Sequence, residues 1–349
     1  MAGSQLILHT LMCNVQPVDG SRRGEFEAEM NRKVKPLGSL GQLESLAIDL
    51  ALMSGRTGVI NHAELFLFAA DHGVAQTGVS IAPQAVTAMM VEQFTRGTAA
   101  INSVCTTTNT PLNIIDAGLL NTVNHVSVID TAVARGTQNF QHEPAMSEAV
   151  ALSSILAGFK LIEHHISKGC DCVLLGEMGI GNTTSAAAIM AALTSFYTSE
   201  CVGHGTGVSD EVVELKVELI SKALLRIDDI SDPLQVLQEV GGLEIAQMVG
   251  AMLASASLKT PVVIDGFICS AAALLAVTIE PNVRGYLIFA HLSDERGHEK
   301  MLSELHAKPL LKLGMKLGEG TGAALAVPLI RSAAACLAHM GTLEQVGLA

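Results

Sequence analysis

Basic residues are scarce in this sequence: 21 Lys and Arg stand against 34 Asp and Glu, which leaves a formal net charge of −13 at pH 7. A protein that binds nucleic acid needs a basic surface, because contacts with the phosphate backbone supply most of the attraction. We therefore exclude nucleic acid as a partner. A small anionic substrate would instead need a local device, such as the backbone N–H groups at the N-terminus of a helix.

Long hydrophobic runs are also missing. Hydrophobic residues make up 49% of the 349-residue chain, yet no stretch of about 18 residues lacks a charge or a break, as a membrane span would require. The most apolar region, Val249–Thr278, contains Lys259, Pro261 and Asp265, so we expect a buried helix, a strand and a second buried helix there. Met1–Gln16 lacks the basic segment and apolar core of a secretion signal. These absences predict a cytoplasmic protein with no membrane partner.

Metal-ligand clusters and nucleophile motifs are absent as well. The only two cysteines close in sequence, Cys170 and Cys172, form a lone CxC pair, which is a weak metal signal. A strand would place both on one face, which favours small core residues over a metal or redox role. The chain contains no GxSxG elbow for a nucleophilic serine. The sequence therefore predicts no metal site and no catalytic triad.

What the chain does contain is an alternation of short β-rich apolar runs and longer helical ones, the pattern of a parallel sheet covered by helices. A polar residue stands at or just beyond the carboxyl end of each run, and ligands bind at that edge of open α/β sheets. The row of polar residues therefore predicts a crevice. The expected strands are Leu65–Ala70, Leu112–Ile115, Val126–Ile129, Cys172–Leu175, Val262–Ile264 and Gly285–Ala290, and the polar residues are Asp71, Asp116, Asp130, Glu177, Asp265 and His291.

Both ends of the chain are expected to be helical and without strands. The sequence predicts an α/β fold with two parts: a Rossmann-like parallel-sheet domain over residues 56–324, and a small helical domain formed by residues 1–55 and 325–349. The chain is long enough to give both parts a buried core. The expected helices are Glu25–Val34, Leu40–Met53, Glu148–His165, Thr184–Thr194, Ser209–Ile227, Leu243–Ser257 and Leu325–His339.

Two glycine-rich segments are candidates for phosphate binding. Gly176–Thr184 lies between a strand and an Ala-rich helix, and its last three residues can cap that helix, leaving N–H groups free for an anion. It is neither a dinucleotide fingerprint nor a P-loop, because the third glycine and the lysine are missing. A plain capped turn remains the alternative. Gly203–Gly207 precedes a helix with Lys216, which could contact a phosphate, although such a lysine is usually solvated.

Two further segments carry ionisable or soft side chains. Glu319 is flanked by glycines at the start of an apolar helix, where a carboxylate is either a helix cap or a working acid/base group. His72 follows Asp71 at a strand end and indicates a polar site. The next helix carries Met89 and Met90, which would normally be core residues. Both interpretations of each segment remain open from the residues alone.

Taken in order, these segments resemble the nicotinate-nucleotide:dimethylbenzimidazole phosphoribosyltransferase family, which assembles the nucleotide loop of cobamides. The resemblance implies an α/β enzyme that is dimeric, uses nicotinate mononucleotide and a small aromatic acceptor, and needs neither cofactor nor metal. It covers nearly the whole chain through Lys35–Gly41, Asp71–Gly73, Gly176–Thr184, Gly203–Gly207, Asp265–Gly266, His291–Ser293 and Leu317–Pro328.

The resemblance also implies roles for individual residues. Glu319 matches the catalytic base and Glu177 a second active-site carboxylate. An acceptor that displaces nicotinate from the opposite face of the β-riboside would give an α-riboside, and Glu319 would take its proton. Residues expected around the nucleotide and its phosphate are Gly179, Gly181, Asn182, Thr183, Gly203, Gly205, Lys216 and Asp265, and those expected in the acceptor pocket are Ser80, Met89, Met90, Met178 and Leu317.

Three residues depart from the family pattern. His204 stands where the glycine loop usually has Arg, which puts the strength of that contact in question. Met89 replaces a typical Gln and Met178 a common Leu, so the acceptor pocket is expected to be softer and more apolar. The chain thus resembles the subgroup that activates phenol or p-cresol, whose enzymes are pairs of related but unequal subunits. We expect phenols among the acceptors, and a homodimer or a heterodimer with a paralogous subunit.

Two other functions compete with the transferase. The chain could be a catalytically weak or structural subunit of a heteromeric phosphoribosyltransferase, but such a subunit would be expected to lose Glu319 and the glycine loops. A nicotinamide-dependent dehydrogenase is disfavoured because the dinucleotide fingerprint is incomplete and no hydride-accepting site is evident.

Overall fold

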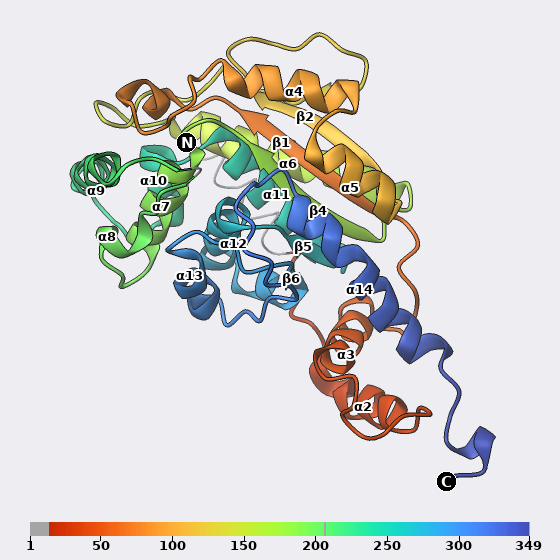
Figure 1. Cartoon of the computed structure of the whole chain (residues 1–349). Helices are drawn as coiled ribbons and strands as arrows, with labels where there is room; N and C mark the ends of the chain where they lie inside the picture. The colour runs from red at the N-terminus through yellow and green to blue at the C-terminus, as the bar shows by residue number, and fades with distance from the viewer. Residues whose placement is uncertain (1–13, 206, 349) are drawn as a thin grey trace.

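A computed structural model describes residues 14–205 and 207–348 and shows an open parallel α/β sheet, as predicted (Figure 1). The strand order is β3-β2-β1-β4-β5-β6, and every neighbouring pair is parallel. The chain moves outward from β1 to β3 and then returns to β4 on the other side of β1, so the order reverses between β1 and β4. The strands are β1 (Ala63–Ala70), β2 (Leu112–Gly118), β3 (Val128–Asp130), β4 (Cys172–Met178), β5 (Val262–Ile264) and β6 (Leu287–Phe289).

All six predicted strands are present, but several of their ends differ. β2 and β4 each continue three residues further than expected, because Asp116 and Glu177 take part in the parallel ladder. β3 begins two residues late, since Val126 is 99% exposed and the Ser127 N–H turns back to the ring of His125. β6 is shorter because a 3₁₀ turn, η3 (Pro281–Tyr286), precedes it. The central strands β1 and β4 are buried along almost their whole length, as expected for a parallel sheet covered on both faces.

Helices cover both faces of the sheet (Figure 1). They are α2 (Arg23–Asn31), α3 (Gln42–Ser54), α4 (Val86–Arg96), α5 (Ala100–Thr108), α6 (Glu148–Ser167), α7 (Asn182–Leu193), α8 (Thr198–Cys201), α9 (Asp210–Leu224), α10 (Pro233–Val240), α11 (Leu243–Ser257), α12 (Phe267–Ile279), α13 (His298–Glu304) and α14 (Thr321–His339). α6 and α11 pack together behind the sheet, whereas α4, α5 and α14 lie in front of it. α12 packs between α7 and α11.

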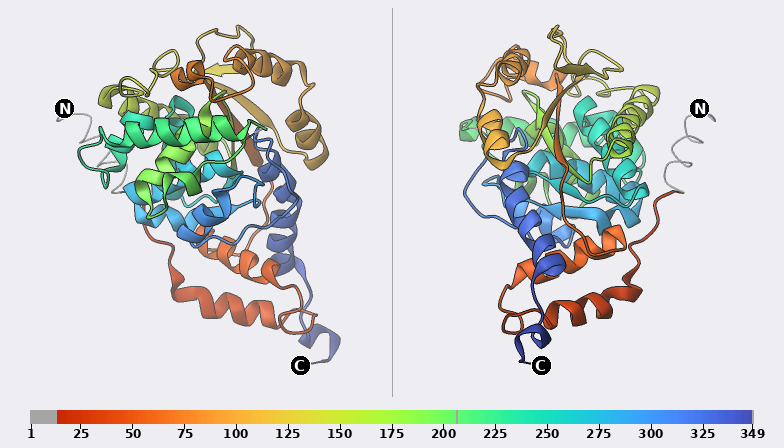
Figure 2. Two further views of the ribbon diagram at one scale, coloured as in Figure 1. Left: turned by 60° about the vertical axis from the view of Figure 1, so that its left-hand side comes forward. Right: turned by 90° about the vertical axis from the view of Figure 1, so that its right-hand side faces the viewer.

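The two chain ends meet beside the sheet. The C-terminal part of α14 packs against α3, α3 packs against α2, and Lys33 bridges Thr342 in an isolated antiparallel contact (Figure 2). The expected domain boundary between residues 324 and 325 falls inside α14, so one continuous helix reaches from the sheet to the terminal helices. The division into two domains stays a prediction. Within the described residues, α14 also has the length and hydropathy of a membrane span, but 56% of it is buried against the rest of the chain.

The contact between α6 and α11 depends on two glycines. A Cβ at Gly158 would overlap the backbone carbonyl of Gln247, and a Cβ at Gly250 would overlap that of Ile155. The two helix backbones therefore touch directly, and no side chain fits between them.

Replacing Gly158 by Ala should lower the free energy of unfolding by about 1–3 kcal/mol or more, because the added methyl group forces the two helices apart. The matched control is Gly24→Ala in α2, where a Cβ meets nothing within 4 Å and the higher helix propensity of Ala should be neutral or stabilising. Urea unfolding followed by circular dichroism would measure both. Equal stability of the two variants would contradict the close packing.

Candidate active site

A cavity of about 240 Å³ lies at the carboxyl ends of β4, β5 and β6. Its position agrees with the expected crevice, since ligands of open α/β sheets bind at this edge. The residues that line it are Met90, Glu177, Met178, Gly179, Ile180, Asn182, Thr183, Gly266, Phe267, Ile268, His291, Ser293, Glu295, Lys316, Leu317, Gly318 and Glu319.

Glu177 and Glu319 are brought together by a backbone contact. The Glu319 N–H donates to the carbonyl oxygen of Glu177 at 3.2 Å, and a Cβ at Gly176 would lie 2.7 Å from the backbone nitrogen of Gly320. Gly318, Glu319 and Gly320 all have positive φ angles, of 83°, 63° and 80°. A glutamate rarely adopts this left-handed conformation, so the surrounding contacts must hold it there.

Glu177 sits in a position that favours its neutral form. Burial raises the pKa of Glu177 to about 8, the hydrogen bond from the Asn182 amide to its carboxylate opposes the shift, and the charges of Asp265, Glu244 and Glu319 add to it. Two neighbouring carboxylates rarely both ionise. A protonated Glu177 therefore allows Glu319 to carry the negative charge.

Glu319 has the properties of a general base. Burial raises the pKa of its carboxyl group, the backbone N–H of Ile101 in the first turn of α5 opposes that shift, and Asp265 adds to it. Its side chain is buried, and its Oε2 atom has no hydrogen-bond partner. A general base works best when its pKa lies near the pH of the reaction, and the raised pKa of Glu319 moves it in that direction. Because Glu319 lines the cavity, its carboxylate is the candidate group for taking a proton from a bound molecule.

Asp265 does not line the cavity and instead holds the start of α14. Its carboxylate accepts hydrogen bonds from the N–H groups of Gly320, at 3.2 Å, and Ala323, at 2.9 Å. Burial raises the pKa of Asp265, and the nearby ring of His291 and the backbone N–H groups oppose the shift. The sequence predicted Asp265 near the nucleotide, but in the structure its side chain positions the loop that carries Glu319. His291 does line the cavity, and its Nδ1 atom is buried without a partner.

The start of α7 differs from the sequence expectation. No side chain caps this helix; Gly181 is the N-cap residue, with φ at 97°, and Asn182 and Thr183 already lie in the first turn. Asn182 uses its amide on Glu177 rather than on the backbone. The N-terminus of α7 is therefore uncapped by side chains, and Gly179, Asn182 and Thr183 line the cavity. Gly181 was also expected near the phosphate, but it does not line the cavity, and a Cβ there would lie 3.3 Å from Ala75.

Gly203, Gly205 and Lys216 meet just outside one end of the cavity, around Glu295. A Cβ at Gly205 would lie 3.9 Å from Lys216 Nζ and 4.0 Å from Glu295 Oε1. Lys216 is only 2% exposed, although a helical lysine is usually solvated. Glu295 was not among the predicted site residues. Its available signal was a run of charged residues directly after a strand.

Three of the five residues expected in the acceptor pocket line the cavity: Met90, Met178 and Leu317. The other two do not. Met89 is 58% exposed on α4, and the hydroxyl group of Ser80 accepts a hydrogen bond from the Ala82 N–H. The apolar wall is completed by Phe267 and Ile268, which sequence reasoning missed. They directly follow the Asp265-Gly266 motif, which was the available signal.

His72 lies beneath this site rather than in it. Its Nε2 atom contacts Glu244 Oε1 at 2.6 Å, and its Nδ1 atom contacts the Ser185 hydroxyl group at 3.1 Å. His72 and Glu244 are fully buried. A Cβ at Gly179 would lie 3.2 Å from the His72 ring, so this polar network supports the turn that lines the cavity.

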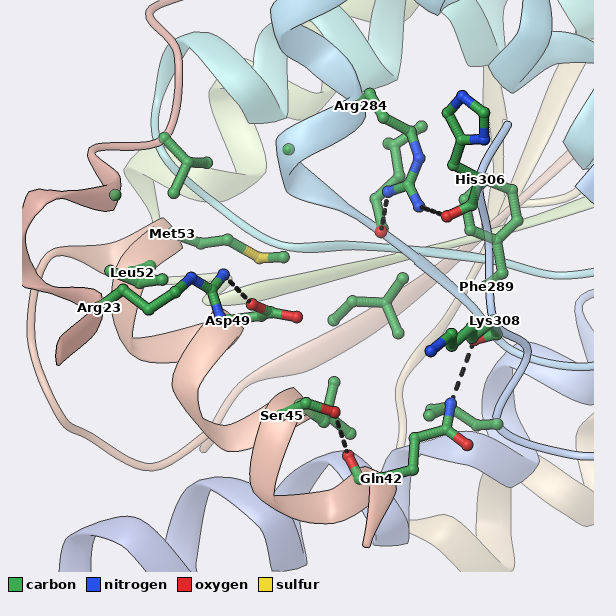
Figure 3. A pocket seen from close by; sticks show the side chains of 17 residues that line it. Arg23, Gln42, Ser45, Asp49, Leu52, Met53, Arg284, Phe289, His306 and Lys308 are labelled. Atoms are coloured by element: carbon green, nitrogen blue, oxygen red, sulfur yellow. Dashed lines mark hydrogen bonds and ion pairs between the residues drawn. The ribbon is translucent and has the colours of Figure 1, made fainter. Parts of the chain in front are cut away.

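A second hollow, of about 390 Å³, lies next to α3 and the start of β6 (Figure 3). Three of its charged groups, Arg23, Asp49 and Arg284, already have partners in the protein. Arg23 pairs with Asp49 at 2.7 Å, and the Arg284 guanidinium donates to the carbonyl groups of Leu305 and His306 at 2.5 and 2.9 Å. The two buried carboxylates lie in the smaller cavity, which we therefore take as the active site. In the part of the chain that the structure describes, no three His, Cys, Asp or Glu side chains are grouped as metal ligands.

Comparison with known proteins gives matches along nearly the whole chain. A family model described as "Phosphoribosyltransferase" matches residues 15–348. A Photobacterium profundum protein named nicotinate-nucleotide–dimethylbenzimidazole phosphoribosyltransferase is 46% identical over 340 residues, which cover 97% of this chain and 99% of the relative. A protein of the same name from Shewanella oneidensis is 47% identical over 342 residues, covering 97% and 98%. The crystal structure of CobT from Thermus thermophilus aligns with a TM-score of 0.91 at 39% identity, over 94% of this chain and 98% of that one.

The raised pKa of Glu177 makes stability depend on pH. Because the folded state holds this proton more tightly than the unfolded state, whose ordinary value is 4.5, stability should be greatest below about pH 4.5 and fall as pH rises through about 8. Glu177→Gln removes this loss, so the variant should exceed the wild type in free energy of unfolding at pH 8, by about 1 kcal/mol or more, and match it near pH 5. Urea titrations across this range, with the exposed Glu304→Gln as control, would measure the difference. If the free energies of unfolding of the wild type and Glu177→Gln changed with pH in the same way, the pKa of Glu177 would not be raised by the fold.

Proposed function

The chain belongs to the nicotinate-nucleotide–dimethylbenzimidazole phosphoribosyltransferase family, and we propose that it transfers the phosphoribosyl group of nicotinate mononucleotide to an aromatic acceptor. Nicotinate leaves, and the product is an α-riboside 5′-phosphate. The observation that carries this proposal is the buried Glu319 carboxylate, which has one oxygen without a hydrogen-bond partner and belongs to a residue that lines a cavity with an apolar wall. An acceptor ring can stack in that cavity and present its proton to this carboxylate.

The proposed reaction uses the two carboxyl groups differently. Glu319 takes the proton of the acceptor N–H or O–H as the new bond to the anomeric carbon forms and the bond to the nicotinate nitrogen breaks. Glu177, whose pKa burial raises to about 8, stays neutral and keeps a second negative charge away from the base. The glycine turn at the start of α7 and the group around Lys216 hold the phosphate. Fixing the phosphate presents the anomeric carbon to the acceptor, which is how positioning lowers a barrier.

Benzimidazoles are acceptors named for the relatives, and we propose that this chain also accepts phenols. Support comes from Met90 and Met178, two flexible thioether side chains in the cavity wall, and from Phe267 and Ile268 beside them. A phenol needs one acceptor for its hydroxyl proton, and Glu319 supplies it. Met89 does not contribute to this argument, because it is exposed. We expect the enzyme to act in the cytoplasm, as a homodimer or with a paralogous subunit.

Glu319→Gln should reduce nicotinate release by about 10²–10⁴-fold, because the variant keeps the shape of the side chain and loses the base. Binding of nicotinate mononucleotide, measured by calorimetry without acceptor, should change little. Glu304→Gln, on the exposed face of α13, serves as the control. Unchanged turnover in the Glu319 variant would remove the base from the mechanism. Absence of turnover in the wild type, with and without a paralogous subunit, would favour a structural role for the chain.

Wild-type protein should turn over both phenol and dimethylbenzimidazole. Met178→Leu should shift the ratio of the two kcat/KM values toward dimethylbenzimidazole by several-fold, since a stiffer side chain replaces an adaptable one at nearly equal volume. Product analysis by mass spectrometry distinguishes the O-linked from the N-linked riboside. Met89→Leu is the matched control outside the cavity. Turnover of dimethylbenzimidazole alone would refute the phenol proposal and leave the transferase intact.

A further inference from the structure

A carboxylate lies where the proposed function needs an anion-binding site. Burial raises the pKa of Glu295, and the ammonium group of Lys216, a hydrogen bond from the Gly205 N–H and the charge of Lys316 oppose that shift, while Asp294 adds to it. Burial lowers the pKa of Lys216, and the negative charge of Glu295 opposes that shift. Glu295, at the wall of the cavity, is thus a negative charge that favours the charged form of the buried Lys216 just outside it.

Groups that can bind a phosphate gather around Gly205, next to the Glu295 carboxylate. The position of a Cβ at Gly205 is surrounded at close range by Lys216 Nζ, at 3.9 Å, the Thr183 hydroxyl oxygen, at 3.9 Å, and Glu295 Oε1, at 4.0 Å. An ammonium group, a hydroxyl group and a backbone N–H that lie on the same side of a cavity are the donors from which an oxyanion site can be built. The other carboxylate oxygen of Glu295, Oε2, lies close to Gly203, where an added Cβ would be 2.6 Å from it.

The backbone around Glu295 is fixed on both sides. The Ser293 N–H donates to His298 Nδ1 at 2.8 Å, the Asp294 N–H donates to the Met315 carbonyl at 2.8 Å, and the His298 N–H donates to the Glu295 carbonyl at 3.0 Å. Burial lowers the pKa of His298 to about 3, so its ring stays neutral and remains an acceptor for Ser293. The Glu295 side chain can therefore move by rotation while its loop stays in place.

We propose that Glu295 occupies the phosphate site of the free enzyme as an internal anion, and that the phosphate of the substrate displaces it from the Gly205 N–H, next to Thr183 and Lys216. The inference rests on the proposed function for the identity of the ligand, a phosphate monoester. A carboxylate and a phosphate dianion repel each other and compete for the same donors. The internal carboxylate favours the charged form of the buried Lys216 while the site is empty. Phosphate can bind only to molecules in which Glu295 has left the site, so the internal carboxylate raises the apparent Kd for phosphate.

The test is direct binding, measured by calorimetry with nicotinate mononucleotide and, separately, with inorganic phosphate, both without acceptor. Glu295→Gln should tighten binding of both ligands by about tenfold, because the competing charge is gone. Asp294→Asn removes one negative charge from the same loop, on an exposed residue outside the cavity, and should change binding much less. Lys216→Met should abolish phosphate binding. Weaker or equal binding in Glu295→Gln would overturn the proposal and indicate that Glu295 assists the substrate, for example at the ribose hydroxyl groups.

A second variant displaces the carboxylate without removing its charge. Gly203→Ala places a methyl group 2.6 Å from Glu295 Oε2, a flexible side-chain end that can swing away, and 3.2 Å from the Arg296 backbone nitrogen, which must yield by a few tenths of an ångström. If the fold is retained, this variant should also bind phosphate more tightly. It covers the case in which Glu295→Gln fails to fold, and weaker phosphate binding by folded Gly203→Ala counts against the proposal. The measurement is separate from turnover. Tighter phosphate binding without transfer would leave the internal anion intact and reject the proposed reaction, whereas transfer with weaker binding would do the reverse.

Discussion

The close approach of Gly176 in β4 to Gly320 before α14 is the constraint on which the rest of the site depends. Because neither residue has a side chain, the two backbones approach closely, and the Glu319 N–H reaches the carbonyl of Glu177. The turn that makes this possible holds Glu319 at a positive φ, and Asp265 secures it from the other side. The backbone contact therefore fixes where Glu177 and Glu319 stand relative to each other.

This arrangement gives the cavity an acidic end and a basic end. At the acidic end, burial and the charge of Asp265 raise the pKa values of both Glu177 and Glu319, so one proton is easily held there. At the other end, Lys216 supplies a buried positive charge that Glu295 balances in the free protein. A substrate with a phosphate at one end and a reacting carbon at the other fits this polarity. The protein as a whole is acidic, so the basic end is a local feature.

Much of the fold was predictable from the sequence, because its signals are local. Short apolar runs marked all six strands, and the polar residue after each run marked the edge at which the cavity lies. The glycines at positions 176, 179, 318 and 320 indicated turns. The errors have local causes too: Asn182 was expected to cap α7, but a buried carboxylate bound its amide instead. Met89 was expected in the pocket, but helix geometry turns it outward and Met90 inward.

By itself, the sequence determined the order of the strands and of most helices along the chain, the acidic surface and the positions at which the backbone can turn, since periodicity, charge and glycine content act within a few residues. It did not indicate the short helices α5, α8, α10 and α13. Only the tertiary structure decided which polar residues meet. Glu177 and Glu319 are far apart in the chain, as are Lys216 and Glu295, and nothing local in either segment specifies its partner. Burial decided their protonation as well, because a pKa depends on the solvent and charges that the completed fold removes or brings near.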